Sequence, residues 1–147
     1  MRFISFLEST SICEQVRAQP YEWNGKNVMW DNGYYYIAAN NPNDPTYLTV
    51  WTEDNKRIGY MATQTVTKKG VPWLKVDNVD IKKSHQGSKL GRTLYQILVW
   101  NMNPERGGLI GYKPDIVNKR VHSIYKRLGA EDDGGDNWFV RNPNAKV

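Results

Sequence analysis

The sequence predicts a single domain of mixed α/β class, in which helices cover a mostly antiparallel sheet. Segments 47–52, 57–66 and 73–81 have strand composition and are joined by short turns, as in an antiparallel meander. At Leu90 the apolar period lengthens from two residues to that of a helix. Strand-like and helix-like segments then alternate toward the C-terminus. Mixed layers of this kind pack helices against the faces of a sheet.

Length and composition restrict the class of protein. The chain has 147 residues, of which 39% are hydrophobic, enough for one domain with a buried core. Its 20 Lys and Arg exceed its 15 Asp and Glu, and the net charge of +5 favours an anionic ligand. Cys13 is the only cysteine, which excludes an intramolecular disulfide and a cysteine-rich metal site.

Apolar runs in the sequence are short. The N-terminal run is shorter than the roughly 7–15 apolar residues of a signal peptide. No stretch approaches the roughly 20 apolar residues of a membrane span. We therefore expect a cytoplasmic protein without a membrane partner.

In the N-terminal third, short motifs delimit the expected elements. Ser11, followed three residues later by Glu14, forms a capping-box pattern and predicts a helix that Pro20 limits. The Asn32–Gly33 pair predicts a tight turn before a strand. The expected elements are a strand at 2–7, a helix at 12–18, a strand at 34–39 and a loop at 40–45.

Two amphipathic helices are expected after the meander. One face of the first helix is defined by apolar residues at i, i+4, i+7 and i+8, namely Leu90, Leu94, Ile97 and Leu98. Pro104 follows it. The second helix covers about 117–128 and closes with Gly129 as its C-terminal cap. The remaining segments are strands at 109–112 and 138–140 and a solvated acidic turn at 131–136.

The segment from Ile81 to Gly91 joins a strand to the first helix through a short turn with two glycines and no acid. Backbone N–H groups in such a turn, at the positive end of a helix, can hold a phosphate group. Four cations belong to this region: Lys82, Lys83, Lys89 and Arg92. The turn lacks the spacing of Walker A and Rossmann loops. Alone, it also fits an ordinary basic loop that contacts no ligand.

Asn118 and Tyr125 form a second pattern. They lie seven residues apart, so on a helix they occupy nearly the same face, two turns from each other. Both side chains could reach a ligand that lies along the helix. Taken alone, the pair fits better a solvated first-turn asparagine and a tyrosine that packs in the core.

Together the two segments resemble the GNAT-type N-acetyltransferases. The family's main motif is Gln/Arg-x-x-Gly-x-Gly/Ala, which the sequence matches at Gln86 and Gly91, with Lys89 in place of the middle glycine. The later helix of the family commonly reads Asn-x-x-Ala-x-x-Leu-Tyr-x-x-x-Gly. The residues at those spacings are Asn118, Val121, Ile124, Tyr125 and Gly129. Segments 47–51 and 58–61 resemble the family's hairpin of strands two and three.

The resemblance implies a single GNAT-like domain over residues 1–147, with a mostly antiparallel twisted sheet and helices on both faces. Residues 46–140 would form the core that binds the cofactor, and residues 1–45 the acceptor side. Acetyl-CoA is the implied co-substrate.

In the family, the strand before the turn separates from its neighbour. The resemblance therefore implies that backbone groups at 79–81 bind the pantetheine arm and polarise the thioester carbonyl. Amides from Gly87 to Gly91 would hold the pyrophosphate, and Lys89 would pair with a phosphate. The implied cofactor-binding residues are Val79, Ile81, Gln86, Gly87, Ser88, Lys89, Leu90, Gly91, Arg92 and Asn118.

By the same resemblance, Tyr125 is the acid that protonates the departing thiolate. The general base stays open. Lys75 stands where some family members carry a glutamate, which leaves Asp77, ranked first, Asp80 on the same strand, or a chain of waters. Strand alternation sends Asp77 and Asp80 to opposite faces unless a bulge intervenes.

The expected function is acetyl transfer from acetyl-CoA to a primary amine by direct attack in a ternary complex. The acceptor, a small molecule or a protein, and the oligomeric state stay open. The alternatives are a GNAT-fold interaction module without catalysis and, less favoured, a basic nucleic-acid-binding domain. His85 and His122 lie on separate elements without nearby cysteines or paired acids, so no metal site is expected.

Overall fold

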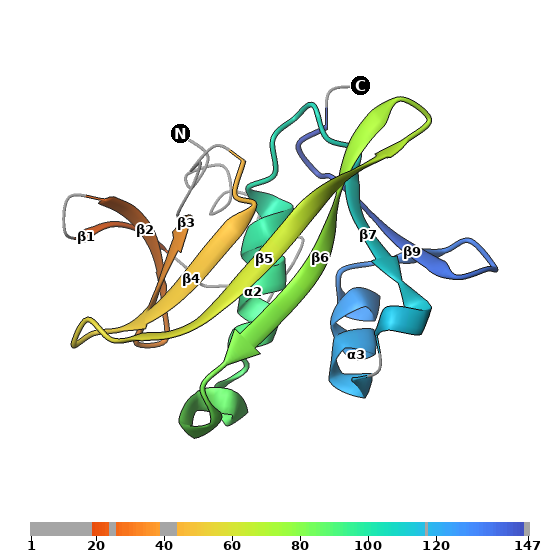
Figure 1. Ribbon diagram of the computed structural model, residues 1–147. Helices are drawn as coiled ribbons and strands as arrows, with labels where there is room; N and C mark the ends of the chain where they lie inside the picture. The colour runs from red at the N-terminus through yellow and green to blue at the C-terminus, as the bar shows by residue number, and fades with distance from the viewer. Residues whose placement is uncertain (1–18, 24–25, 39–43, 117, 146–147) are drawn as a thin grey trace.

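The computed structural model describes residues 19–23, 26–38, 44–116 and 118–145, with side chains from residue 32 onward. Within this part of the chain, nine strands form one sheet in the order β1-β2-β3-β4-β5-β6-β7-β9-β8 (Figure 1). Neighbouring strands are antiparallel except for β6 and β7, which are parallel. The predicted mixed α/β class with a mostly antiparallel sheet is therefore confirmed.

The strands are β1 Gln19–Trp23, β2 Lys26–Asp31, β3 Tyr34–Ala38, β4 Tyr47–Thr52, β5 Arg57–Lys68, β6 Val71–Ile81, β7 Gly108–Tyr112, β8 Glu131–Asp132 and β9 Asn137–Arg141. The helices are α2 Leu90–Trp100 and α3 Lys119–Arg127, and the 3-10 turns are η1 Lys83–Ser88 and η2 Lys113–Asp115.

Most of the predicted elements are confirmed, because their signals are local. The meander forms β4, β5 and β6, and the two amphipathic patterns form α2 and α3. The Asn32–Gly33 turn has positive φ at both residues, 53° and 86°, as a tight hairpin requires. Strands β1 and β2 are new, since their sequences show no clear alternation of apolar residues. The predicted elements at 2–7 and 12–18 lie outside the described residues.

Both α-helices pack against the same face of the sheet. Leu94 and Leu98 of α2 and Tyr125 of α3 belong to one buried cluster with side chains from β4 to β7 and β9. The rings of Tyr95 and Tyr125 touch across the two helices, with centroids 5.5 Å apart. This shared core holds α2 and α3 side by side beneath the sheet.

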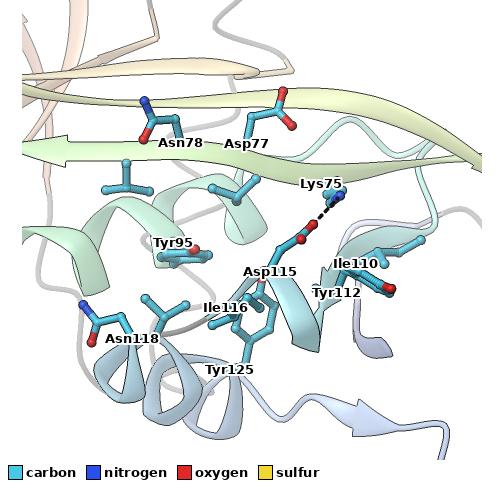
Figure 2. Close-up of a pocket in the computed structure, with 14 residues that line it drawn as sticks. Lys75, Asp77, Asn78, Tyr95, Ile110, Tyr112, Asp115, Ile116, Asn118 and Tyr125 are labelled. Carbon is cyan, nitrogen blue, oxygen red and sulfur yellow. Dashed lines mark hydrogen bonds and ion pairs between the residues drawn. The ribbon is translucent and has the colours of Figure 1, made fainter. Parts of the chain in front are cut away.

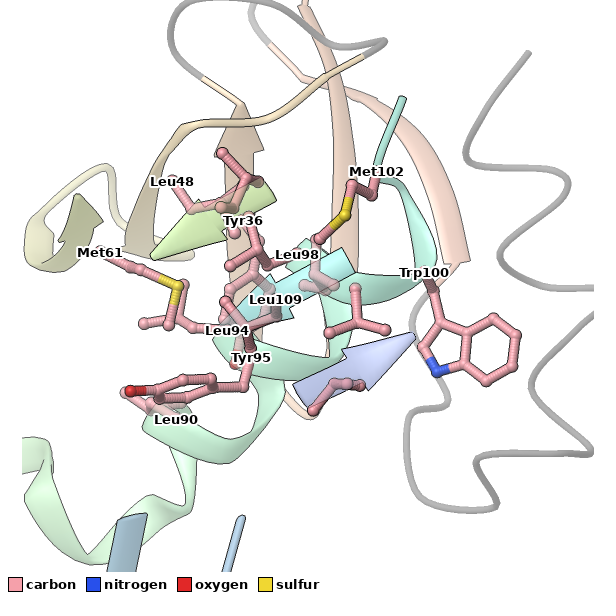
Figure 3. Packing of buried hydrophobic residues seen from close by; sticks show 14 of the residues in the cluster. Tyr36, Leu48, Met61, Leu90, Leu94, Tyr95, Leu98, Trp100, Met102 and Leu109 are labelled. Carbon is pink, nitrogen blue, oxygen red and sulfur yellow. The ribbon is translucent and has the colours of Figure 1, made fainter. Parts of the chain in front are cut away.

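Helix α2 is the centre of the core (Figure 3). Leu94 and Leu98 are fully buried and pack with Tyr36, Met61 and Leu109 from three strands. Burying a leucine side chain stabilises the fold by roughly 1.5–3 kcal/mol. The same packing fixes the first turn of α2 at the end of β6.

Strands β6 and β7 pair over a short length and then separate. Their register contains only Leu74 with Leu109 and Lys75 with Ile110. Beyond Lys75, β6 continues to Ile81 beside β5, and no described strand pairs with it on its β7 side. Figure 1 shows the two strands diverging, with α3 below β7. Backbone groups of β6 that point toward β7 are therefore available to a ligand.

A bulge interrupts β6 in the region of separation. Ala62 of β5 pairs with Asn78 and the adjacent Thr63 pairs with Val76, so Asp77 is an extra residue. Bulges bend a strand, increase its twist and redirect its side chains. The bulge lies just beyond the last β6–β7 pair and helps the two strands to part.

Candidate functional site

A cavity of about 450 Å³ occupies the opening between β6 and β7 (Figure 2). Its lining comes from β6, α2, the segment from β7 through η2, and α3. The lining residues are 75–79, Tyr95, 110–112, 115–116, Asn118, Val121 and Tyr125. Elements distant in the sequence thus meet around one cavity whose size suits a small organic ligand.

Tyr125 lies at the helix side of this cavity and is only 1% exposed. Its ring packs on Tyr95 and Trp138. Gly111 of β7 provides the space: a Cβ there would lie 2.7 Å from Cζ and 3.0 Å from the hydroxyl of Tyr125. Burial raises the pKa of Tyr125 well above its ordinary value, and the adjacent Tyr95 adds to the shift. Tyr125 therefore stays protonated at neutral pH.

Tyr95 of α2 is a cavity residue that the sequence analysis missed. Its side chain lines the cavity and shares a hydrogen bond with Tyr125. Burial raises the pKa of Tyr95 to about 12, although the hydrogen bond with Tyr125 opposes this rise. The available signal was a tyrosine beside Leu94 on a core-facing helix, since a buried hydroxyl normally needs a partner.

The buried tyrosine pair predicts a loss of stability at alkaline pH. Both folded pKa values lie above the ordinary value of 10. Above pH 10 the unfolded chain therefore releases protons that the folded chain retains, and stability present below pH 10 falls as the pH rises. Each tyrosine contributes a slope of about 1.4 kcal/mol per pH unit. Urea unfolding of the wild type and of a Tyr95→Phe/Tyr125→Phe variant measures this, and equal slopes would refute it.

The two candidate bases lie on the same side of β6. Val76, Val79 and Ile81 all pack against the core, although the first two are three residues apart, because the bulge at Asp77 shifts the alternation. In Figure 2, Asp77 and Asn78 lie on the side of β6 away from Tyr95 and Tyr125.

Asp77 lines the cavity, whereas Asp80 does not. Asp80 stands between Val79 and Ile81, which face the core, and is exposed on the other side. An unbroken strand would place Asp77 and Asp80 on opposite faces. The bulge at Asp77 shifts the alternation, so both lie on the same side of β6. Asp77 is the better placed of the two carboxylates.

Lys75 is held at the closed end of the cavity. Its Nζ lies 3.2 Å from a carboxylate oxygen of Asp115 and 5.6 Å from the ring centre of Tyr112. The ion pair joins β6 to η2 at the last position where β6 and β7 pair. The ion pair thus links the β6 side of the cavity to the η2 side, and the Lys75 ammonium group is occupied by Asp115.

The basic turn after β6 forms η1, and its predicted residues hold it in place. The Gln86 side-chain Nε2 donates a hydrogen bond to the Ile81 carbonyl at 3.0 Å, which caps the end of β6. The Lys82 N–H donates to Ile58 O at 2.8 Å, and the His85 N–H donates to Lys82 O at 2.9 Å. Gln86 therefore has a structural contact that shapes the turn.

Lys89 begins α2 in a left-handed conformation, with φ of 61° and ψ of 26°. This explains the preference for glycine at the motif position, because glycine adopts this backbone without a steric penalty. No side-chain cap hydrogen bond forms at Lys89, and no acid lies in the first turn of α2. The helix presents uncapped N–H groups, which suits an anion.

Exchanging Lys89 separates the backbone effect from the charge effect. Lys89→Gly and Lys89→Ala both remove the ammonium group, but only glycine fits φ of 61° without strain. We expect the glycine variant to be more stable than the alanine variant by about 1 kcal/mol in urea unfolding. Both variants should bind acetyl-CoA with similarly reduced affinity. Equal stability would contradict the backbone argument.

Three more predicted residues lie where the turn enters α2. A Cβ at Gly87 or Gly91 would meet no protein atom within 4 Å, so both residues border open space. Leu90 is buried and anchors the helix start in the core. Arg92 is half-buried, and its Nε has no hydrogen-bond partner among the described residues. The backbone that joins the turn to α2 is therefore anchored by Leu90 on one side and borders open space at Gly87 and Gly91.

A contact from β3 also holds the turn. The Tyr34 hydroxyl shares a hydrogen bond with Nδ1 of His85 at 2.9 Å and donates to Oγ of Ser88 at 3.4 Å. The rings of Tyr34 and His85 meet edge to face. Sequence reasoning missed Tyr34, because 51 residues separate it from His85. This contact ties the N-terminal part of the sheet to the middle and the C-terminal end of η1.

Removing this contact should loosen the turn. Tyr34→Phe keeps the ring and removes one hydroxyl, which is worth about 1 kcal/mol. We expect acetyl-CoA to bind about 5-fold more weakly, with kcat unchanged at saturation, as measured by calorimetry and steady-state kinetics. Tyr47→Phe is the control, since its hydroxyl contacts Arg57 and not the turn. An equal effect in both variants would refute the prediction.

Asn118 is the N-cap of α3 and lines the cavity. Its Oδ1 accepts a hydrogen bond from the Arg120 N–H at 2.9 Å. Because Tyr125 follows two turns later and lines the same cavity, the predicted shared face is present. The capping bond fixes the Asn118 side chain at the rim, where its amide group can contact a ligand.

The two histidines are placed apart from each other. His122 bonds to the Ile116 carbonyl at 2.7 Å and packs edge to face on Trp138, whereas His85 contacts Tyr34. Among the described residues, no group of three or more His, Cys, Asp and Glu side chains is arranged to hold a metal ion. None of the described helices is long and apolar enough to cross a bilayer.

A parallel strand pair that separates next to a basic turn at a helix start is the arrangement that the resemblance to the GNAT acetyltransferases predicts. The chain belongs to the acetyltransferase (GNAT) family, whose model matches residues 11–130. The resemblance found in the sequence is thereby confirmed. Comparison with curated proteins gives no match.

Solved structures with a similar fold have low sequence identity to this chain. One is a GCN5-related glucosamine N-acetyltransferase region of a fungal multi-domain GH3 beta-N-acetylglucosaminidase, at 17% identity and a TM-score of 0.46. That match covers 59% of this chain but only 12% of the fungal chain. AtaTR bound with AcCoA has 16% identity and a TM-score of 0.44, covering 65% and 66% of the two chains. The KacTA–DNA complex has 16% identity and a TM-score of 0.45, covering 77% and 70%.

Proposed function

We propose that this protein is an acetyl-CoA-dependent N-acetyltransferase that acetylates a primary amine by direct attack in a ternary complex. The observation that carries the proposal is the opening between β6 and β7, where a strand without a partner on one side borders a cavity of about 450 Å³. Family membership supports acetyl transfer as the reaction class and acetyl-CoA as the co-substrate. We assign sites on this chain to the pantetheine arm, the pyrophosphate and the thioester.

The pantetheine arm, which resembles a short peptide, is proposed to lie along β6. Free backbone groups between Val76 and Ile81 can bond its amides, as a neighbouring strand would. The pyrophosphate would lie at the uncapped start of α2, where Gly87 and Gly91 leave open space. Lys89 is exposed beside this space and can pair with a phosphate.

The thioester would then lie between the bulge of β6 and the tyrosine pair. A backbone N–H of β6 near Val79 is placed to polarise the carbonyl, as in an oxyanion hole. Tyr125 stays protonated, and the pair that it forms with the adjacent Tyr95 is our candidate for the acid function toward the departing thiolate. Asp77, on the other side of β6, is our candidate to accept the amine's proton, directly or through water, with Asp80 further from the cavity. The amine is therefore expected to approach from the Asp77 side.

One feature favours a second function. Lys75 occupies the position at which some family members carry an acid, and it pairs with Asp115. A GNAT fold with a weak base could bind acetyl-CoA, or no ligand, and act as an interaction module. Asp77 at the cavity argues for catalysis, and the two functions differ in turnover.

The test measures binding and turnover separately. Acetyl-CoA and CoA are titrated by calorimetry and thermal unfolding, since a ligand of the folded state raises Tm. Thiol release is then followed with a panel of small primary amines and lysine-containing peptides. Binding with amine-dependent thiol release supports the proposal. Binding without turnover supports the interaction module. An unchanged Tm at an acetyl-CoA concentration about 100 times a micromolar Kd rejects acetyl-CoA as the ligand.

A further inference from the structure

We propose that Tyr95, a residue of α2 outside the two sequence motifs, delivers the proton to the coenzyme A thiolate, and that Tyr125 acts by donating its own hydrogen bond to Tyr95. This inference rests on the proposed function and specifies the acid chemistry of the same cavity. It begins from the contact of two phenols at one wall.

The geometry joins the two side chains into a unit. Both line the cavity, and their ring centroids are 5.5 Å apart with planes at 67°. The ring of Tyr125 packs against that of Trp138, with ring centroids 5.4 Å apart, and against the backbone of Gly111. Tyr95 projects from α2 between α3 and β6 (Figure 2), which is the wall along which the thioester would lie. In the view of Figure 2, Tyr95 is drawn at a level between β6 and Tyr125.

The energetics of ionisation favour the same order. A deeply buried phenolate is costly, and the cost is larger for Tyr125 than for Tyr95. The hydrogen bond between them lowers the pKa of Tyr95 and raises that of Tyr125. Tyr95 releases its proton first, because Tyr125 remains a neutral donor that stabilises the resulting phenolate. Its pKa of about 12 is also closer to that of a thiol, near 8.5.

The proton balance of the step is complete. The amine nitrogen forms a bond to the acetyl carbon, and the bond from that carbon to sulfur breaks. The departing sulfur takes the hydroxyl proton of Tyr95, and the Tyr95 phenolate accepts a hydrogen bond from Tyr125. The proton lost from the amine nitrogen leaves through Asp77 or water, and solvent returns one proton to Tyr95. The products are the amide and free coenzyme A, with both tyrosines restored.

Phenylalanine substitutions test the order, since they keep the aromatic packing. With saturating acetyl-CoA, we expect Tyr95→Phe to lower kcat about 100-fold. Tyr125→Phe should lower it about 10-fold, because the acid remains but its phenolate loses a hydrogen bond. The double variant should resemble Tyr95→Phe, since the two residues act as one unit. The Kd for acetyl-CoA should stay within about twofold in each variant.

A second readout is independent of turnover and of a purely structural role. Alkaline titration followed by tyrosinate absorbance should show one titration step that belongs to Tyr95. The pKa of this step should rise in Tyr125→Phe, and the step should be absent in Tyr95→Phe. Tyr47→Phe, whose hydroxyl contacts Arg57 away from the cavity, is the control for loss of any hydroxyl.

Four results would overturn the inference. The first is an active wild type whose Tyr95→Phe variant retains full kcat. The second is a larger decrease of kcat in Tyr125→Phe than in Tyr95→Phe. Both leave the proposed function intact. The third, a wild type that releases no thiol with any amine, overturns the proposed function as well. A Tyr95→Phe variant with a changed Kd and an unchanged titration would indicate a packing role and likewise refute proton delivery.

Discussion

Replacing Gly111 with alanine is expected to reduce kcat about 100-fold, since a displacement of reacting groups by about 1 Å can cost that much. The new Cβ would lie 2.7 Å from Cζ and 2.8 Å from Cε1 of Tyr125. Trp138 and Tyr95 hold the other sides of the ring, so Tyr125 cannot retreat without disturbing them. Overpacking of this kind also destabilises a fold by about 1–3 kcal/mol.

The measurements for Gly111→Ala are kcat with saturating acetyl-CoA and the free energy of unfolding in urea. Gly135→Ala is the matched control, because a Cβ there meets only the Asp133 side chain, at 3.3 Å or more, outside the cavity. Wild-type kcat in Gly111→Ala would show that the position of Tyr125 does not matter for turnover. Such a result would remove the phenol pair from the mechanism.

Gly91→Ala should have the opposite profile, with an unaltered fold and a large loss of cofactor affinity. No protein atom lies within 4 Å of a Cβ at Gly91, which is in the first turn of α2. Alanine is moreover a better helix residue than glycine by about 1 kcal/mol. If the pyrophosphate contacts this backbone, however, the added methyl group occupies the space of a phosphate oxygen. We expect acetyl-CoA to bind about 100-fold more weakly, a change of about 2.7 kcal/mol.

Calorimetric Kd values and Tm without ligand test Gly91→Ala. Its kcat at saturation should stay near that of the wild type, which distinguishes it from Gly111→Ala. An unchanged Kd would show that the open space beside Gly91 is not the phosphate site. In that case the turn would keep only the structural role that its contacts with Tyr34 and Ile81 already give it.

The proposed acid and the proposed base lie on opposite sides of β6, which has a consequence for the expected acceptor. The tyrosine pair lies on the helix side of the strand, whereas Asp77 and Asn78 lie on the other side. A thioester held at the bulge would be reached by the amine from one side, and its thiolate would leave toward the other. Such an arrangement would suit the direct attack that we propose.

The sequence was sufficient for elements whose signals are local. Alternation and helical periodicity predicted β4, β5, β6, α2 and α3, and the glycine and charge spacing predicted a turn that starts α2. Tyr125 and Asn118 could be paired because helical geometry relates residues seven apart. β1 and β2 lack a regular pattern, so no local rule indicated them.

The long-range part of the site could not be predicted in the same way. The bulge at Asp77 depends on the register with Ala62 and Thr63, and it decides which side of β6 each carboxylate occupies. Tyr34 reaches the turn across 51 residues. Tyr95 looked like one more core residue of an amphipathic helix. Only its contact with Tyr125 shows that its hydroxyl belongs to the cavity.

By itself, then, the sequence determined the order of most elements from β3 onward, the basic turn that starts α2 and the family, because these follow from neighbouring residues along the chain. The tertiary structure alone decided where β6 and β7 separate, which carboxylate borders the cavity and which phenol accompanies Tyr125. Each of these depends on strand register and on packing between residues that are distant in the sequence. Such contacts are set by the whole core and leave no local pattern to read.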